Sequence, residues 1–154
     1  MYNEFEAWSK LSHKNIIKLY EIIDDPSHDY LYLVMDLADL GQIAIWQKEE
    51  EKYKRNEAVV NWILSNKYPT TKFATEQDKV EEISKYVFRH IVEALVYLHE
   101  QTNIVHRDIK PDNILFSTQD GNVKITDFTV SKQLIPGQEV CYDTEGTAAF
   151  TGIF

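Results

Sequence analysis

His106-Arg107-Asp108-Ile109-Lys110-Pro111-Asp112-Asn113 is the stretch of sequence that decides the fold, and Asp127-Phe128 follows it closely. This region contains a possible base (Asp108), a cation (Lys110) and two possible ligands for a hard metal ion (Asn113 and Asp127). Phosphoryl transfer needs such groups, because it depends mainly on positioning and on neutralising charge. Each residue alone would most often be an ordinary surface or structural residue, but their order and spacing together favour a catalytic loop.

The segment between the two motifs predicts a short hairpin. Ile114–Phe116 and Val123–Ile125 are apolar runs, and Asp120-Gly121 between them is a typical hairpin turn. Such a hairpin would bring Asn113 and Asp127 together, although they are far apart in the chain.

Upstream of the motif, the sequence predicts a long core helix. Thr75–Asp78 resembles a helix start with an acidic first turn, and the helical pattern continues through His99. Near Ile91 and Leu95 we expect this helix to leave an apolar face open to water. The apolar residues at helical spacing are Val80, Ile83, Val87, Ile91, Leu95 and Leu98.

The N-terminal part predicts a helix over residues 3–12 and then a hairpin. Ile16–Ile23 and Tyr30–Leu37 are β-like runs around the turn cluster at 24–28. This hairpin is too small to be stable alone, so we expect its edge to be exposed. The apolar face of the first helix would be formed by Phe5, Trp8 and Leu11.

The middle of the chain is highly charged. After a break at Gly41, Trp46–Lys67 predicts one or two helices ending before Pro69. Lys48–Arg55 mixes both signs of charge and is typical of a solvated helix face. Strands, helices and a late hairpin together indicate an α+β fold.

The composition of the chain limits the kinds of binding partner and the cellular location that we expect for the protein. The formal charge of −9 argues against nucleic acid or an anionic membrane surface as a main partner. Cys141 is the single cysteine, which fits a reducing compartment, and no apolar run approaches the ~20 residues of a membrane helix. No secretory signal is recognisable at the N-terminus, so we expect a cytoplasmic location.

The motif at 106–113 with Asp127-Phe128 resembles the catalytic domain of eukaryotic Ser/Thr protein kinases. The resemblance implies ATP and Mg²⁺ as cofactors and a protein as substrate. Asp108 would be the base and Lys110 would neutralise charge on the transferring phosphoryl group. Asn113 and Asp127 would hold magnesium, and Lys110 points to Ser/Thr rather than Tyr specificity.

The resemblance also assigns residues outside the loop. Glu4, which precedes His13–Ile17 in the register of the family's helix C, would be the ion-pairing glutamate. Met35 would be the gatekeeper beside the adenine pocket. The hinge and the residue beneath the adenine ring would be Asp36, Leu37, Ala38 and Leu115.

Further assignments concern the core and the activation segment. Arg107 would pair with a phosphate in that segment, with Thr144 as the modification site and Thr147 as the substrate-facing threonine. An upstream kinase or a regulatory protein is therefore a possible partner. The family's stack of four side chains across the two lobes would be Trp8, Leu19, His106 and Phe128.

Within the family, three segments look most like the calcium/calmodulin-dependent protein kinase kinases: 18–26, 30–37 and 126–131. The fold implied is a partial bilobal kinase domain over residues 1–154. Its parts would be an N-lobe remnant (1–35), a hinge (36–42), a helical insertion region (43–75) and the start of the C-lobe (76–154).

The chain departs from the family pattern in several places. It contains no glycine-rich loop or strand lysine upstream of Glu4, and Thr151–Phe154 stands where the family has Ala-Pro-Glu. Thr129 replaces the glycine of the usual Asp-Phe-Gly, and Gln47–Thr75 is longer than the family's link by roughly twenty residues. Two alternatives to a kinase therefore remain open: a catalytically inactive, pseudokinase-like binding module, or a truncated product.

Overall fold

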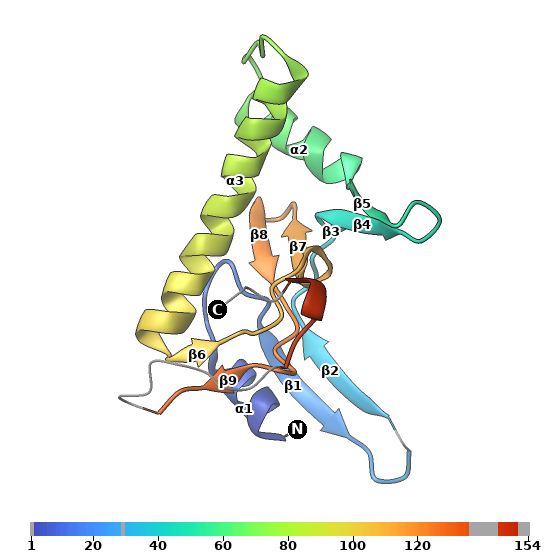
Figure 1. Ribbon diagram of the computed structural model, residues 1–154. Coiled ribbons are helices and arrows are strands. Elements are labelled where there is room, and N and C mark those ends of the chain that lie inside the picture. Colours follow the sequence, from blue (N-terminus) through green and yellow to red (C-terminus); the bar gives the residue numbers. More distant parts are fainter. Residues whose placement is uncertain (1, 29, 136–144, 151–154) are drawn as a thin grey trace.

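The computed structural model describes residues 2–28, 30–135 and 145–150, and of residues 2–4 the backbone alone. Helices and short strands are mixed, which confirms the expected α+β class (Figure 1). The helices are α1 (Tyr2–Lys10), α2 (Glu57–Lys67) and α3 (Glu76–Val96). The strands are β1 (Leu19–Asp24), β2 (Leu31–Met35), β3 (Gly41–Gln42), β4 (Ala44–Gln47), β5 (Lys52–Arg55), β6 (Ile104–Val105), β7 (Ile114–Ser117), β8 (Asn122–Ile125) and β9 (Lys132–Gln133).

The hairpin of β7 and β8 lies at the centre of the fold, as the Asp-Gly turn predicted. Ile114 pairs with Ile125, and β3 adds to β7 to give the strand order β3-β7-β8. The N-terminal segment joins the other edge, because Ile17 N donates to Ile125 O at 2.9 Å and Ile125 N donates to Asn15 O at 2.9 Å. Segments more than 100 residues apart in the chain therefore meet on one small sheet.

Helix α3 confirms the predicted long helix and runs beside β8 (Figure 1). Its start is a capping box, in which Thr75 Oγ1 accepts from Asp78 N and Asp78 Oδ2 accepts from Thr75 N. The helix continues as a π turn over Tyr97–Gln101. The expected apolar face open to water near Ile91 and Leu95 is confirmed, but neighbouring residues form it, since Ile91 is buried and Leu95 is half-buried against the core. The exposed apolar residues are one turn apart on the outer side: Phe88, Val92 and Val96.

A single core joins α1, α2, α3 and the central sheet. Phe5, Trp8 and Leu11 are buried on one face of α1, as their spacing predicted. The Trp8 indole also donates to Ile17 O at 2.8 Å, which fixes α1 against the N-terminal segment of the sheet. The largest fully buried side chains include Trp8, Phe116 and Phe128.

The β1–β2 hairpin forms a separate two-stranded sheet, which extends away from the core in Figure 1. Tyr20, Tyr30 and Tyr32 are exposed on it, together with Leu37 just beyond β2. The predicted hairpin is confirmed, and within the described residues no further strand pairs with β1 or β2.

The expectation of helix throughout Trp46–Lys67 is wrong for its first half. Residues 44–55 form the β4–β5 hairpin, and α2 begins only at Glu57. The rings of Trp46 and Tyr53 pack across the hairpin, with centroids 5.0 Å apart. Glu50 pairs with Lys52 and Lys54, so the alternating charges stabilise the turn rather than a helix face.

Asn56 fixes the boundary between this hairpin and α2. Its Oδ1 accepts from Ala58 N as the N-cap, and its Nδ2 donates to Leu40 O and Gln42 O, each at 2.9 Å. The start of α2 is thereby tied to the segment that leads into β3.

Among the helices in the described ranges, none combines the length and apolar character needed to cross a bilayer.

Candidate active site

Buried His106 fixes the backbone of the predicted catalytic loop through hydrogen bonds. Nε2 of His106 lies 2.9 Å from Thr126 O, and Asp108 N donates to Nδ1 at 3.2 Å. These partners require the proton on Nε2, and burial lowers the pKa of His106, so the ring is neutral. His106 therefore fixes the backbone next to Asp108 and supplies no charge.

Asp108 is buried and is surrounded by donors. Its Oδ1 accepts from Thr147 N at 2.9 Å and Thr147 Oγ1 at 2.6 Å, and its Oδ2 lies 2.8 Å from Lys110 Nζ. Burial raises the pKa of Asp108, but the hydrogen bonds from Lys110 and Thr147 outweigh it and lower the pKa to about 2. The carboxylate is thus ionised at neutral pH.

Asn113 and Lys110 complete the group around this carboxylate. Asn113 Nδ2 donates to Asp108 O at 2.9 Å and to Asp108 Oδ2 at 3.0 Å. Lys110 Nζ also donates to Thr147 Oγ1 at 2.8 Å. The structure therefore brings the predicted residues Asp108, Lys110 and Asn113 into one hydrogen-bonded cluster.

The β7–β8 hairpin brings Asp127 to this cluster. Asn113 precedes β7 and Asp127 follows β8, and Thr126 N donates to Asn113 O at 3.0 Å where the two segments meet. Asp127 has a φ of 62°, in the left-handed region that non-glycine residues seldom adopt. Thr129 donates to Asp127 Oδ1 from its backbone N at 3.3 Å and from its Oγ1 at 2.7 Å.

A stack of rings links α1 to the loop. Phe128 packs against Trp8, with centroids 5.4 Å apart, and edge-on against His106 at 4.7 Å. Leu19 is buried in the same core. The four residues expected to form the stack are thus all buried, and three are in direct ring contact.

The side chain of Arg107 contacts two groups that lie far from it in the sequence. Its side chain donates to Val130 O at 2.5 Å and to Glu145 Oε2 at 2.7 Å. Gly146 follows with a φ of 116°, and a Cβ built on it would lie 2.2 Å from Arg107 O. Only glycine fits at this position. The close approach of Gly146 to the backbone of Arg107 places Thr147 within hydrogen-bond distance of Asp108. The expected modification site, Thr144, lies outside the described residues.

The residues predicted to contact the nucleotide are not joined by hydrogen bonds like those around Asp108, as far as the described residues show. Met35 ends β2 with its side chain exposed, and Asp36 N donates to Lys18 O at 3.0 Å, so the hinge begins as an extension of the hairpin. Ala38 and Leu115 are half-buried against the common core. Glu4 lies in α1, and its side chain is outside the described part of the chain.

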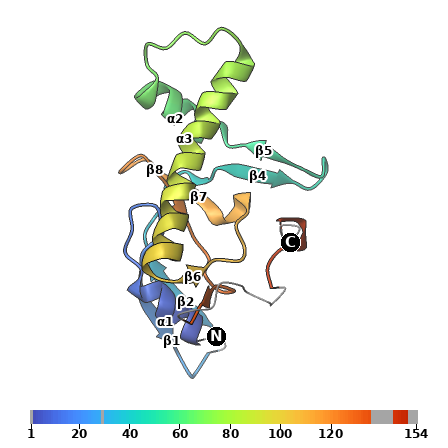
Figure 2. The ribbon, with the colours of Figure 1, turned by 60° about the vertical axis from the view of Figure 1, so that its left-hand side comes forward.

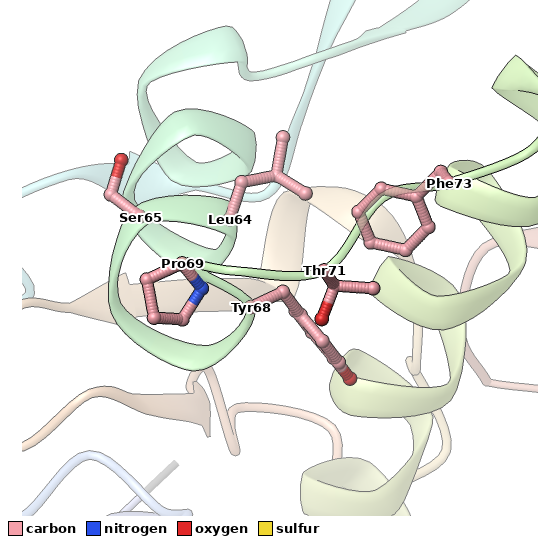
Figure 3. Close-up of a pocket in the computed structure, with 6 residues that line it drawn as sticks. All are labelled: Leu64, Ser65, Tyr68, Pro69, Thr71 and Phe73. Atoms are coloured by element: carbon pink, nitrogen blue, oxygen red, sulfur yellow. The ribbon is translucent and has the colours of Figure 1, made fainter.

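A separate hollow of about 500 Å³ lies where the chain turns from α2 to α3 (Figure 3). The rings of Tyr68 and Phe73 approach to 6.0 Å there. Its lining residues include no Asp, Glu, His, Lys or Arg, so the hollow offers neither a carboxylate base nor a cation for phosphoryl transfer. The lining residues are Leu64, Ser65, Tyr68, Pro69, Thr71 and Phe73.

Comparison with known families decides the assignment: residues 1–152 match the model of the protein kinase domain. The chain belongs to the protein kinase domain family. Its fold is accordingly a partial kinase domain.

Curated relatives of this kinase domain are Ser/Thr kinases. A probable serine/threonine-protein kinase of Dictyostelium discoideum is 32% identical over 147 residues, which are 96% of this chain and 16% of the relative. A calcium/calmodulin-dependent protein kinase kinase of Caenorhabditis elegans is 35% identical over 147 residues, 96% of this chain and 22% of the relative. A SNF-related serine/threonine-protein kinase of Rattus norvegicus is 30% identical over 140 residues, 91% and 15% respectively. The kinase domain thus spans about a fifth or less of these relatives' length.

Sequence reasoning missed several contacts in this kinase domain. The Arg107–Glu145 pair, the Thr129–Asp127 bonds and the docking of the β4–β5 hairpin on the catalytic loop were not foreseen. Thr129 stands where the family has glycine, and its hydroxyl could have indicated a local bond to Asp127. Nothing in the local sequence indicates the other two contacts.

Proposed function

We propose that this domain is part of a Ser/Thr protein kinase that transfers the γ-phosphoryl group of ATP to hydroxyl groups of proteins. The observation that carries the proposal is the position of Thr147 Oγ1, a hydroxyl 2.6 Å from Asp108 Oδ1 and 2.8 Å from Lys110 Nζ. A hydroxyl can therefore occupy the space between the carboxylate and the cation, as an acceptor Ser or Thr must.

In this reaction Asp108 orients the acceptor hydroxyl and accepts its proton, and its low pKa keeps it ionised for that role. Lys110 neutralises charge that develops on the transferred group. Asn113 holds the backbone and the carboxylate of Asp108 in place through two hydrogen bonds. The neutral His106 accepts a hydrogen bond from the backbone N of Asp108 and so keeps the loop in place.

Asn113 and Asp127 are proposed as the magnesium ligands. Magnesium binds to one or two protein oxygens and fills its remaining positions with water and phosphate, so a full protein cage is not needed. Asn113 uses its Nδ2 toward Asp108, which leaves Oδ1 for the metal. Bound magnesium would supply positive charge to the phosphates.

The nucleotide would lie between the hinge and β7. We assign the adenine contacts to Met35, the backbone of Asp36 and Ala38, and the side chain of Leu115, with Glu4 as the family's ion-pairing glutamate. We propose the four parts that the resemblance implies: an N-lobe remnant (1–35), a hinge (36–42), an insertion region (43–75) and the start of the C-lobe (76–154). The insertion region contains a hairpin followed by a helix. An acidic domain with a single cysteine suits cytoplasmic protein substrates and regulators.

Titration calorimetry with ATP, with and without Mg²⁺, tests this proposal on the chain and on Asp127→Ala. We expect binding that depends on Mg²⁺ and is weakened at least about tenfold in Asp127→Ala, because a metal ligand is lost. Asp120→Ala, an acidic residue in the β7–β8 turn, is the matched control and should bind as the parent does. Binding of equal strength without Mg²⁺, or no binding, would favour a non-catalytic binding module instead.

Thr129 is expected to position Asp127 for the metal. Thr129→Val keeps the shape of the side chain but removes the hydroxyl that donates to Asp127 Oδ1. Without this bond the carboxylate of Asp127 is no longer held in one orientation, so we expect Mg²⁺-dependent ATP affinity to fall roughly tenfold. Because Thr129 is exposed, the unfolding free energy should change by less than about 0.5 kcal/mol.

Thr129→Ser retains the hydroxyl and is the control for this experiment. It should bind Mg²⁺ and ATP within about twofold of the parent, since the donor to Asp127 is still present. Equal behaviour of the Val and Ser variants would show that the hydroxyl has no part in positioning Asp127.

A further inference from the structure

A hollow of about 560 Å³ opens beside the catalytic loop, and Lys110, Asn113 and Thr147, which contact Asp108, line one part of it. The β4–β5 hairpin, which belongs to the insertion relative to the family, forms one side of it. Figure 2 shows this hairpin on the same side of the molecule as the 3-10 turn Ala148–Phe150. The main lining residues are Trp46, Tyr53, Lys110, Asp112, Thr147 and Phe150.

The hairpin is anchored to the catalytic loop by a specific contact. Tyr53 donates its phenolic hydrogen to Asp112 Oδ2, and Gln42 Nε2 donates to Asp112 O at 3.3 Å. The hydrogen bond with Asp112 raises the pKa of Tyr53 to about 12, so the phenol keeps its proton at neutral pH. The hollow therefore has a fixed wall.

The wall is aromatic and open to water. Trp46 is 46% exposed and Phe150 is 43% exposed, and the ring of Tyr53 lies between them at 5.0 Å and 6.1 Å. Exposed aromatic surface gathered at one place favours an apolar partner, because covering it removes that surface from water. Asp112 is the acidic residue that lines the hollow, and its Oδ2 already accepts a hydrogen bond from Tyr53. The hollow therefore attracts a basic side chain less strongly.

The position of the hollow limits what can fill it. Lys110 and Thr147 line it, and both contact Asp108, where the proposed acceptor hydroxyl lies. An extended chain advances about 3.3–3.6 Å per residue, so a substrate residue close to the acceptor in sequence would reach the hollow.

We propose that the β4–β5 hairpin forms a specificity subsite for an apolar, preferably aromatic, side chain of the protein substrate within two residues of the acceptor Ser or Thr. The proposal rests on the proposed function, because that function places the acceptor at Asp108. Trp46, Tyr53 and Phe150 recognise the side chain, and none of them takes part in phosphoryl transfer.

Fluorescence anisotropy with labelled peptides tests the subsite on the full chain. Each peptide carries one threonine in an alanine-rich background, and one phenylalanine is moved through the neighbouring positions. We expect phenylalanine at one position within two residues of the threonine to tighten binding about tenfold over alanine. Trp46→Ala and Phe150→Ala should each remove most of this gain, and Trp46→Phe should retain it.

Ile45→Ala is the matched control, because Ile45 is the exposed neighbour of Trp46 on β4 and points to the opposite face of the hairpin. It should leave the gain from phenylalanine unchanged. A scan without any position-dependent gain, or a gain that persists in Trp46→Ala, would overturn the subsite.

A second peptide pair separates the subsite from the function on which it rests. Replacing the peptide threonine by valine tests the acceptor position at Asp108 and leaves the phenylalanine in place. If threonine and valine peptides bind alike while the gain still depends on Trp46, the acceptor assignment fails and the aromatic site stands. If threonine is preferred but no phenylalanine position matters, the subsite fails and the function stands.

Discussion

Phe128→Ala is expected to destabilise the chain by about 3–5 kcal/mol, as large-to-small changes at buried aromatic residues do. Phe128 is 1% exposed and packs between Trp8 and His106, so its loss leaves a cavity between α1 and the catalytic loop. Small domains are stable by about 5–15 kcal/mol, so this one change removes a large part of the total. The free energy of unfolding from urea titration measures the effect.

Phe88→Ala is the matched control, because Phe88 is 64% exposed on the outer side of α3. The same atoms are deleted, but no cavity forms, and we expect a change within about 0.5 kcal/mol. A decrease in unfolding free energy of less than about 1 kcal/mol in Phe128→Ala would mean that the ring stack does not hold α1 against the catalytic loop.

Gly146→Ala is expected to separate the activation segment from the catalytic loop. The new Cβ would lie 2.2 Å from Arg107 O, a backbone atom that cannot turn aside, so the segment must move. Thr147 then loses its two hydrogen bonds to Asp108, each of them to a charged group and typically contributing about 1.5–3 kcal/mol. We expect the pKa of Asp108 to rise, because these bonds lower it while burial raises it.

Carboxyl NMR titration of Asp108 measures this change. The pKa of Asp108 is lowered by folding, so the stability it provides is complete above about pH 4 and disappears as the pH falls toward 2. In Gly146→Ala the loss should begin at a higher pH. Gly41→Ala is the control, since Gly41 also has a positive φ, 66°, but nothing lies within 4 Å of its Cβ. An unchanged Asp108 titration in Gly146→Ala would contradict the prediction.

Local patterns in the sequence were sufficient for the main elements. The capping box at Thr75, the apolar spacing of α3 and the Asp-Gly turn at 120–121 are each satisfied by near neighbours in the chain. They could therefore be interpreted without the fold. The same holds for the catalytic motif, whose members Asp108, Lys110 and Asn113 lie within one short loop.

The β4–β5 hairpin shows where local reasoning fails. The alternating charges of residues 48–55 suit a helix face as well as a tight turn, and nothing within that segment decides between them. The decision comes from distant partners, because Tyr53 bonds to Asp112 and Asn56 bonds to Leu40 and Gln42. Tertiary contacts thus override a weak local preference for helix.

The sequence by itself determined the family, the candidate catalytic loop and the order of the main helices and hairpins, because those features depend on residue types at short spacing. Only the tertiary structure decided which distant groups meet: Thr147 on Asp108, Glu145 on Arg107, and an aromatic hairpin on Asp112. Such contacts depend on how separate segments pack, and packing is set by the whole core rather than by any local pattern.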